Sequence, residues 1–171
     1  MRLTILTTGG TIDKTYNEFD GSLANSRSVL DVILGALRLP DLFVRHTVVM
    51  HKDSLDMTEE DRLVVLKAVR DALPTSDAVV ILHGTDTLAK TGEVLHRELG
   101  EIDIPVILTG AMRPYEFRDT DAMQNVTEAL LAARLLDGGV YAVMHNRVLP
   151  FPGVKKDRQA GTLVGGEGVG V

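Results

Sequence analysis

Five short apolar runs, separated by segments with helical periodicity, constrain the fold of this chain more than any other feature. The runs lie at residues 3–7, 44–50, 78–82, 105–108 and 140–144. Their short length and β-branched residues are typical of strands. Their nearly continuous apolarity is typical of strands that are buried on both faces of a parallel sheet. The sequence therefore predicts a central sheet that is mostly parallel.

Segments with helical periodicity fill the spaces between these runs. They lie at 29–37, at 58–73, at 88–99, and from Asp119 or Thr120 to Gly138-Gly139. Four repeats of a strand followed by a helix predict right-handed crossovers and a doubly wound α/β fold with helices on both faces of the sheet. At 171 residues, we expect a single domain over residues 1–160, followed by a glycine-rich C-terminal tail at 161–171.

The segment at 58–73 carries the clearest helix signal. Thr58 can cap its first turn, Asp61 follows three residues later as in a capping box, and Pro74 ends the helix. The apolar stripe expected to face the core consists of Leu63, Leu66, Val69 and Leu73.

Composition excludes several classes of function. The formal net charge is −6, and the longest basic cluster is Lys155-Lys156 with Arg158 nearby, so we expect no nucleic-acid partner. The chain has no cysteine, and its five histidines show no metal-binding spacing, so we expect neither a metal ion nor a cofactor. With no run of 18 apolar residues and no signal peptide, the sequence predicts a soluble, cytoplasmic protein without a membrane contact.

Polar segments directly follow four of the predicted strands. They are Gly9-Gly10-Thr11, Asp53-Ser54, Gly84-Thr85-Asp86 and Gly110-Ala111-Met112. Because ligands of open α/β sheets bind outside the carboxyl ends of the strands, we expect these four loops to converge at one rim.

Three of these loops also have an ordinary structural explanation. Gly9-Gly10-Thr11 lacks the spacing of a nucleotide-binding loop, so a turn with Thr11 as a bystander is about as plausible as a functional site. Asp86 or Thr87 could simply cap the helix predicted at 88–99. Arg113 could clamp a carboxylate or pair with a nearby acidic side chain, Asp119 or Asp121.

Two further polar positions lie close to the predicted rim. His83, at the end of a buried strand, is expected to be a hydrogen-bonded structural residue. Lys155 and Lys156 follow the last predicted strand and are expected to be solvated. One of them could instead lie beside Asp86 and take part in proton transfer.

The segments TTGGTID, DSLDM, HGTDTL and TGAMRP, in this order, resemble the bacterial-type L-asparaginases. The resemblance covers most of the chain and is to the N-terminal catalytic domain of that family. Family members continue into a second, smaller domain, which we expect to be absent here. The resemblance implies hydrolysis of L-asparagine to L-aspartate and ammonia through a β-acyl-enzyme, without a cofactor, in a homo-oligomer that is a dimer or a tetramer.

The resemblance also implies roles for individual residues. Thr11 would be the nucleophile and Tyr16 would orient it. The remaining catalytic set would be Thr85, Asp86 and Lys156, with Lys155 as the alternative lysine. The substrate-binding residues would be Gly10, Ser54, Thr85, Asp86 and Ala111. Leu55 stands where a polar residue of the family often contacts the substrate, which leaves the preference between asparagine and glutamine open. The group that deprotonates Thr11 is also left open.

Two other functions remain open from the sequence. The first is an amidase that supplies ammonia to a tRNA-dependent amidotransferase, because such enzymes carry a similar domain. The second is a non-catalytic module that binds an amino acid. Retention of Thr11, Tyr16, Thr85, Asp86 and a lysine favours an enzyme over the binding module.

Overall fold

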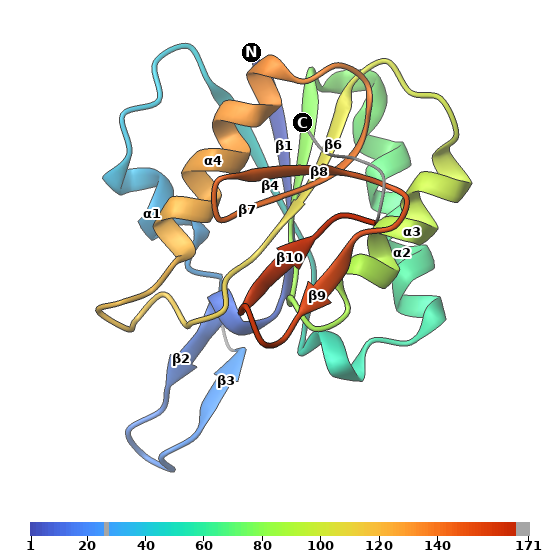
Figure 1. The fold of residues 1–171 in the computed structure, drawn as a ribbon. Helices are drawn as coiled ribbons and strands as arrows, with labels where there is room; N and C mark the ends of the chain where they lie inside the picture. Colours follow the sequence, from blue (N-terminus) through green and yellow to red (C-terminus); the bar gives the residue numbers. More distant parts are fainter. Residues whose placement is uncertain (26–27, 167–171) are drawn as a thin grey trace.

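A mostly parallel sheet of six strands runs through the computed structural model, which describes residues 1–25 and 28–166 (Figure 1). In spatial order the strands are β4 (Phe43–Lys52), β1 (Arg2–Gly9), β5 (Ala78–Leu82), β6 (Pro105–Thr109), β7 (Gly139–Met144) and β8 (Arg147–Pro150). The first five are parallel to their neighbours, whereas β8 is antiparallel to β7. The five predicted strands are confirmed. Burial on both faces is wrong for β4, because this strand lies at the edge of the sheet and none of its residues is fully buried.

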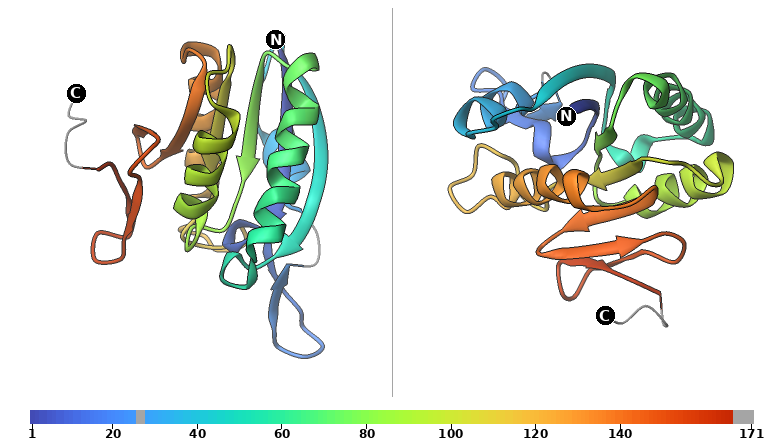
Figure 2. Two further views of the ribbon diagram at one scale, coloured as in Figure 1. Left: turned by 90° about the vertical axis from the view of Figure 1, so that its right-hand side faces the viewer. Right: turned by 90° about the horizontal axis from the view of Figure 1, so that it is seen from above.

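In the described residues, four α-helices cover the two faces of this sheet (Figure 2). Helices α1 (Leu30–Ala36) and α4 (Ala122–Leu135) contribute to one buried cluster, and α2 (Glu59–Ala72) and α3 (Leu88–Leu99) contribute to the other. The prediction of a doubly wound α/β fold is therefore confirmed. None of the helices described here is long and apolar enough to cross a membrane.

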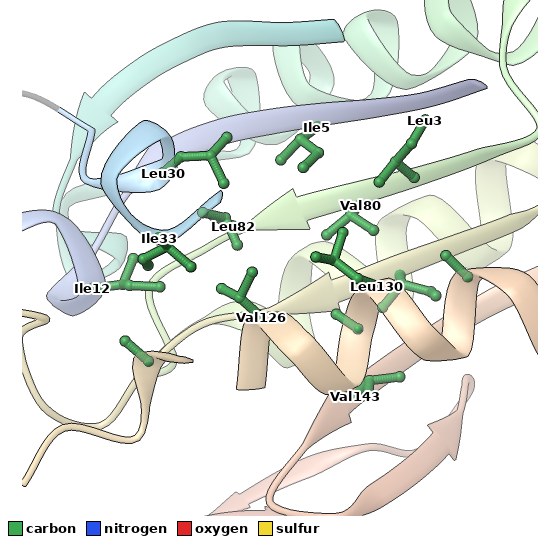
Figure 3. Close-up of a cluster of buried hydrophobic side chains, with 14 of the residues drawn as sticks. Leu3, Ile5, Ile12, Leu30, Ile33, Val80, Leu82, Val126, Leu130 and Val143 are labelled. Carbon is green, nitrogen blue, oxygen red and sulfur yellow. The ribbon is translucent and has the colours of Figure 1, made fainter. Parts of the chain in front are cut away.

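Alternation along each strand divides the apolar side chains between the two clusters. In β5, Val80 and Leu82 belong to the cluster with α1 and α4, while Val79 and Ile81 belong to the cluster with α2 and α3. Figure 3 shows the first of these clusters, with Leu130 of α4 among the strand side chains. Burial on both faces explains why inner strands such as β5 and β6 appear in the sequence as uninterrupted apolar runs.

The order of the strands reverses at β1. Along the chain, the five parallel strands are β1, β4, β5, β6 and β7. In space β4 lies on one side of β1 and β5 lies on the other. The loops that leave the carboxyl ends of β1 and β5 therefore diverge to opposite sides of the sheet, and this is where open α/β sheets form a ligand-binding crevice.

The long helix α2 begins as the sequence predicts, and the face that it buries overlaps the predicted stripe at Leu66 and Val69. The Thr58 hydroxyl accepts a hydrogen bond from the Asp61 N–H at 3.3 Å, and the Asp61 carboxylate accepts one from the Thr58 N–H at 2.8 Å, which completes the capping box. Leu63 is 54% exposed, so its predicted place in the core is wrong. The buried face carries the predicted Leu66 and Val69 together with Arg62, Val65 and Ala72. After α2 the chain forms a 3₁₀ turn at Leu73–Thr75, which includes Pro74.

Two hairpins extend the chain beyond the sheet. The first consists of β2 (Lys14–Tyr16) and β3 (Leu23–Asn25), and the second of β9 (Lys155–Asp157) and β10 (Thr162–Val164). Strand β10 lies inside the segment expected to be a tail, and its Leu163 is fully buried in the cluster with α2 and α3. Pairing with β9 thus corrects the expected start of the tail. Residues 167–171 lie outside the described residues.

Candidate active site

Glycines let the loops after four parallel strands pack directly on one another. A Cβ atom on Gly10 would lie 2.4 Å from the Cα of Gly84, and one on Gly84 would lie 2.6 Å from the Oγ of Ser54. A Cβ atom on Gly110 would lie 2.2 Å from the carbonyl oxygen of His83. The loops after β1, β4, β5 and β6 therefore converge at one rim, as the sequence predicts.

Thr11 lies at the carboxyl end of β1, where a sharp turn is fixed by the backbone. Gly10 has φ 89° and ψ −174°, a conformation essentially restricted to glycine, and its N–H donates to the Lys52 carbonyl at 3.0 Å. Thr11 then begins a 3₁₀ turn, Thr11–Asp13, in which Ile12 is fully buried. This anchoring holds Thr11 at the rim with its side chain partly exposed.

The Thr85 and Asp86 side chains are joined by one lysine. The Lys156 Nζ donates to the Thr85 Oγ1 at 2.8 Å and to the Asp86 Oδ1 at 3.0 Å. Lys156 and Asp86 are mostly buried, and Thr85 is 2% exposed. Lys155, the alternative lysine, is exposed on the same strand. Strand β9 thus brings Lys156, and not Lys155, to the loop after β5.

The capping explanation for the loop after β5 is wrong. Thr87 precedes α3 but its side chain makes no capping bond, because its Oγ1 donates to the Ser54 carbonyl at 2.7 Å. Asp86 is occupied by ion pairs with Lys156 and Arg158, each at 3.0 Å. The polar residues of this loop therefore serve contacts between loops.

A second ion pair lies close to the group formed by Lys156, Thr85 and Asp86, here called the Lys156 group. The Lys14 Nζ lies 2.7 Å from the Asp53 Oδ2, with both side chains about one-quarter exposed. The hydrogen bond from Lys14 lowers the pKa of Asp53, burial opposes this change, and the charge of Lys156 contributes to the lowering. The rim therefore carries two lysine–aspartate ion pairs, Lys14–Asp53 and Lys156–Asp86, that are close enough to affect each other electrostatically.

Ser54 and Leu55 occupy different environments. Ser54 is 1% exposed, and its Oγ accepts a hydrogen bond from the Thr87 N–H at 3.3 Å. Ser54 therefore joins the converging loops, but its hydroxyl is covered in this structure. Leu55 is 64% exposed and offers no polar group to a ligand.

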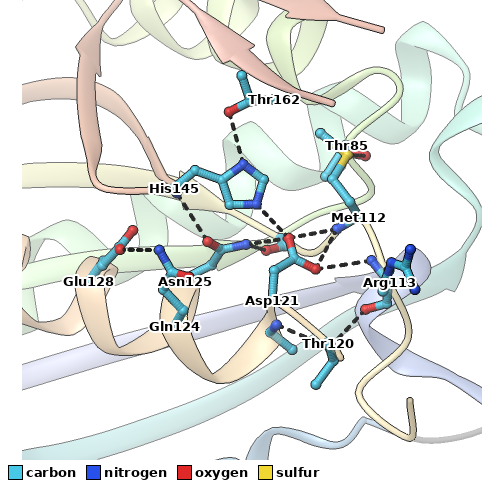
Figure 4. A network of polar contacts seen from close by, with 12 residues as sticks. Thr85, Met112, Arg113, Thr120, Asp121, Gln124, Asn125, Glu128, His145 and Thr162 are labelled. Atoms are coloured by element: carbon cyan, nitrogen blue, oxygen red, sulfur yellow. Dashed lines mark hydrogen bonds and ion pairs between the residues drawn. The ribbon is translucent and has the colours of Figure 1, made fainter. Parts of the chain in front are cut away.

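Ala111 belongs to a loop that is fixed by a half-buried carboxylate (Figure 4). Asp121 accepts hydrogen bonds from the N–H groups of Met112 at 2.9 Å and Arg113 at 3.0 Å, and it contacts the Nε2 of His145 at 2.8 Å. Burial would raise the pKa of Asp121, but the hydrogen bonds from Met112, His145 and Arg113 outweigh burial, so the pKa is lowered. His145 is not predicted from the sequence as part of this network, because it lies far along the chain in the turn after β7.

The structure also places two other residues that the sequence analysis names, Arg113 and Tyr16. Arg113 forms an ion pair with Asp119, so its ordinary structural explanation accounts for it. Tyr16 lies in the β2–β3 hairpin, which projects from the rim in Figure 1, and is 61% exposed. Within residues 1–25 and 28–166, no hydrogen bond joins the Tyr16 hydroxyl to Thr11. The structure therefore does not bring Tyr16 together with the other site residues.

His83 is a buried structural residue, as the sequence predicts. Its Nδ1 lies 2.8 Å from the Gly84 carbonyl oxygen, and its Nε2 lies 2.8 Å from the Thr91 Oγ1. Burial lowers the pKa of His83 from 6.5 to about 4, and the charge of Arg62 acts in the same direction. A neutral His83 thus connects the loop after β5 to Thr91 of α3 through these hydrogen bonds.

The part of the chain that the structure describes contains no group of three or more His, Asp or Glu residues positioned to hold a metal ion.

Similar proteins are found by sequence and by structure. A family model described as "Asparaginase, N-terminal" matches residues 2–161. The L-asparaginase of Thermococcus kodakarensis is 32% identical over 161 residues, which are 94% of this chain and 49% of that protein. A glutamyl-tRNA(Gln) amidotransferase subunit of Methanococcus vannielii is 28% identical over 148 residues, 85% of this chain and 34% of that protein.

A solved structure shares the same fold. The probable cytoplasmic L-asparaginase from Campylobacter jejuni superposes with a TM-score of 0.74 at 29% identity, over 91% of this chain and 48% of that chain. The present chain thus spans about half, or less, of the length of these relatives.

The contact between Gly10 and Gly84 can be tested by substitution. We expect Gly10→Ala to lower the free energy of unfolding by about 3 kcal/mol or more, because it adds a steric clash to backbone strain. Gly100→Ala is the matched control: Gly100 also has a positive φ, 62°, but a Cβ there meets no atom within 4 Å. We expect a cost of about 1–2 kcal/mol for it in urea unfolding. Equal costs for the two variants would contradict the close packing of these loops.

The buried His83 predicts a pH dependence of stability. Its folded pKa of about 4 lies below its unfolded value of 6.5, so the unfolded chain binds a proton first as the pH falls. Between pH 6.5 and 4, His83 should therefore reduce the free energy of unfolding by up to about 1.4 kcal/mol per pH unit. Above pH 6.5 it should have no effect. Urea unfolding of wild type and His83→Gln at several pH values isolates this contribution, and identical slopes would refute it.

Proposed function

Because the chain belongs to the asparaginase family, we propose that it hydrolyses the side-chain amide of L-asparagine to give L-aspartate and ammonia. The observation that carries the proposal is the Lys156 group: one ammonium joins the Thr85 hydroxyl and the Asp86 carboxylate. The loop that carries these residues packs against the loop that carries Thr11. A hydroxyl, a cation and a carboxylate at one rim are the groups that amide hydrolysis needs.

In this proposal the Thr11 hydroxyl attacks the amide carbon. The hydroxyl loses its proton as the new C–O bond forms, and the amide oxygen takes the negative charge. Collapse of this intermediate breaks the C–N bond while the proton taken from Thr11 is passed to the nitrogen, which leaves as ammonia. Water then hydrolyses the β-acyl-threonine and releases L-aspartate. The N–H groups near Gly10 and Thr85 are the proposed donors to the oxyanion.

The Thr85 hydroxyl is suited to pass a proton. It accepts from the Lys156 ammonium, and its own proton is directed to the Met112 sulfur at 3.5 Å. A thioether is a weak acceptor, so this proton can be redirected to a stronger one at little cost. We propose that Thr85, Lys156 and Asp86 act as one coupled unit: Lys156 gives a proton to the Asp86 carboxylate and receives the Thr85 proton, while Thr85 takes the proton from Thr11.

The substrate would be held by groups of several loops. Asp86 would bind the α-ammonium group, and the Ala111 carbonyl would accept from the leaving amide. The neighbouring carbonyl of Gly110 is held by the Asn125 amide at 2.9 Å, which supports a fixed loop. Ser54 and Tyr16 contribute only if the loop after β4 opens and the β2–β3 hairpin closes over the site, because Ser54 is buried and Tyr16 is exposed.

A second candidate function is the supply of ammonia to an amidotransferase. The similarity to the glutamyl-tRNA(Gln) amidotransferase subunit of Methanococcus vannielii favours this candidate. It predicts ammonia release from L-glutamine, whereas the first proposal predicts release from L-asparagine. A module that only binds an amino acid would release ammonia from neither.

Location and assembly are also part of the proposal. The similarity to the probable cytoplasmic enzyme from Campylobacter jejuni supports a cytoplasmic location. Association into a homo-oligomer is supported by large apolar side chains that are exposed on α4, Leu131 at 58% and Leu135 at 72%. The α/β domain, including the β9–β10 hairpin, would be the catalytic unit of each subunit.

Substitution of the two hydroxyl residues tests the proposed mechanism. We expect Thr11→Ala and Thr85→Ala each to reduce ammonia release from L-asparagine by roughly 10³-fold or more, since groups that act as a unit fail together. Thr11→Ser keeps a hydroxyl and should retain measurable turnover. Circular dichroism and unfolding temperatures should match the wild type. A folded Thr11→Ala variant with nearly normal turnover would contradict the assignment of Thr11 as the nucleophile.

A further inference from the structure

Two cations share one oxygen of Asp86. The Lys156 Nζ and the Arg158 Nη2 each lie 3.0 Å from the Oδ1 of this carboxylate. Among the described residues, none donates a hydrogen bond to the other oxygen, Oδ2. The mechanism proposed above uses Lys156 and leaves Arg158 without a role. One carboxylate oxygen is thus shared by two cations.

The contact between Arg158 and Asp86 contributes little to folding. The Arg158 side chain is 72% exposed, and exposed ion pairs typically add little to stability. Its guanidinium therefore can leave Asp86 at little cost. A planar guanidinium binds carboxylates through two parallel hydrogen bonds, which a lysine does not offer.

The other groups near the rim are poorly placed to hold a substrate carboxylate. Ser54 is covered and bonded to Thr87, and the exposed Leu55 has no polar side-chain atom. The Lys14 ammonium is already paired with Asp53 at 2.7 Å. Lys156 is mostly buried and donates to Thr85 as well as Asp86. Arg158 is thus the cation at Asp86 that is open to solvent.

We propose that Arg158 is a specificity residue that binds the α-carboxylate of the substrate, an inference that rests on the proposed function. When an α-amino acid enters, its ammonium group binds Asp86 and displaces the Arg158 guanidinium. Because the carboxylate is bonded to the same carbon as the ammonium, it enters beside the released guanidinium and pairs with it. One ion pair is exchanged for two, so the site selects ligands that carry both charges.

Steady-state kinetics on three amides tests this exchange. For Arg158→Gln we expect KM for L-asparagine to rise about 10-fold, the value of one charge-assisted hydrogen-bonded pair, with kcat within about twofold of the wild type. Succinamate, which keeps the carboxylate but lacks the ammonium, should show a similar rise. For 3-aminopropanamide, which lacks the carboxylate, KM should stay constant or fall because Asp86 no longer has Arg158 as a competitor. Arg158→Lys should recover part of the affinity for L-asparagine.

Lys155→Gln provides the matched control, because it removes one exposed charge from the same hairpin. We expect it to leave all three KM values unchanged. If the wild type is active and Arg158→Gln leaves KM for L-asparagine unchanged or lowers it, the role of Arg158 is overturned. The proposed function then stands. Calorimetry measures the Kd for the product L-aspartate in the absence of turnover. We expect Arg158→Gln to raise this Kd about 10-fold. A wild type that neither hydrolyses the amides nor binds L-aspartate overturns the proposed function and the inference together.

Discussion

The contact between the backbones of Gly10 and Gly84 is the constraint on which the candidate site depends. The strand order places the loops after β1 and β5 on either side of a reversal point, and open α/β sheets bind ligands in such a crevice. Because neither glycine carries a Cβ, the two loops meet, and Gly84 in turn rests on Ser54 of the loop after β4. Thr11 and Thr85 follow these glycines directly, so their positions are set by backbone packing and not by flexible side chains.

Polar and charged side chains also hold the loops of the candidate site together. Lys156 reaches the rim from a hairpin that follows the sheet, and it connects that hairpin with the loop after β5, about 70 positions earlier in the chain. The same hairpin is tied to the turn after β7, since the Thr162 Oγ1 lies 2.9 Å from the Nδ1 of His145, whose other nitrogen contacts Asp121 (Figure 4). The hairpin that carries Lys156 and the loop that carries Ala111 are thus held by one hydrogen-bonded network.

Much of the fold could be predicted from the sequence, and parts of the site could not. Strands buried on both faces leave a strong apolar pattern, which reveals β1, β5, β6 and β7. The edge strand β4 is found from its short run of apolar and β-branched residues, although it is not buried. Leu63 is misplaced because its spacing fits the apolar stripe, whereas packing buries Val65 and the Arg62 side chain instead. Strand β10 is short and flanked by glycines, so no periodicity reveals it. The contacts of Arg158 and His145 are not predictable because their partners are distant in sequence, and Tyr16 depends on the position of a hairpin that local patterns do not determine.

The central claim is that the loop after β5 and the hairpin lysine form one catalytic unit. The most direct test compares ammonia release from L-asparagine by Lys156→Met and Lys155→Met, which remove the same charge from adjacent positions of β9. Lys156 contacts Thr85 and Asp86, whereas Lys155 is exposed. The account predicts that kcat falls by roughly 10²-fold or more in Lys156→Met, the scale of a lost proton-transfer group, and stays at the wild-type value in Lys155→Met. Equal activity of the two folded variants would contradict it.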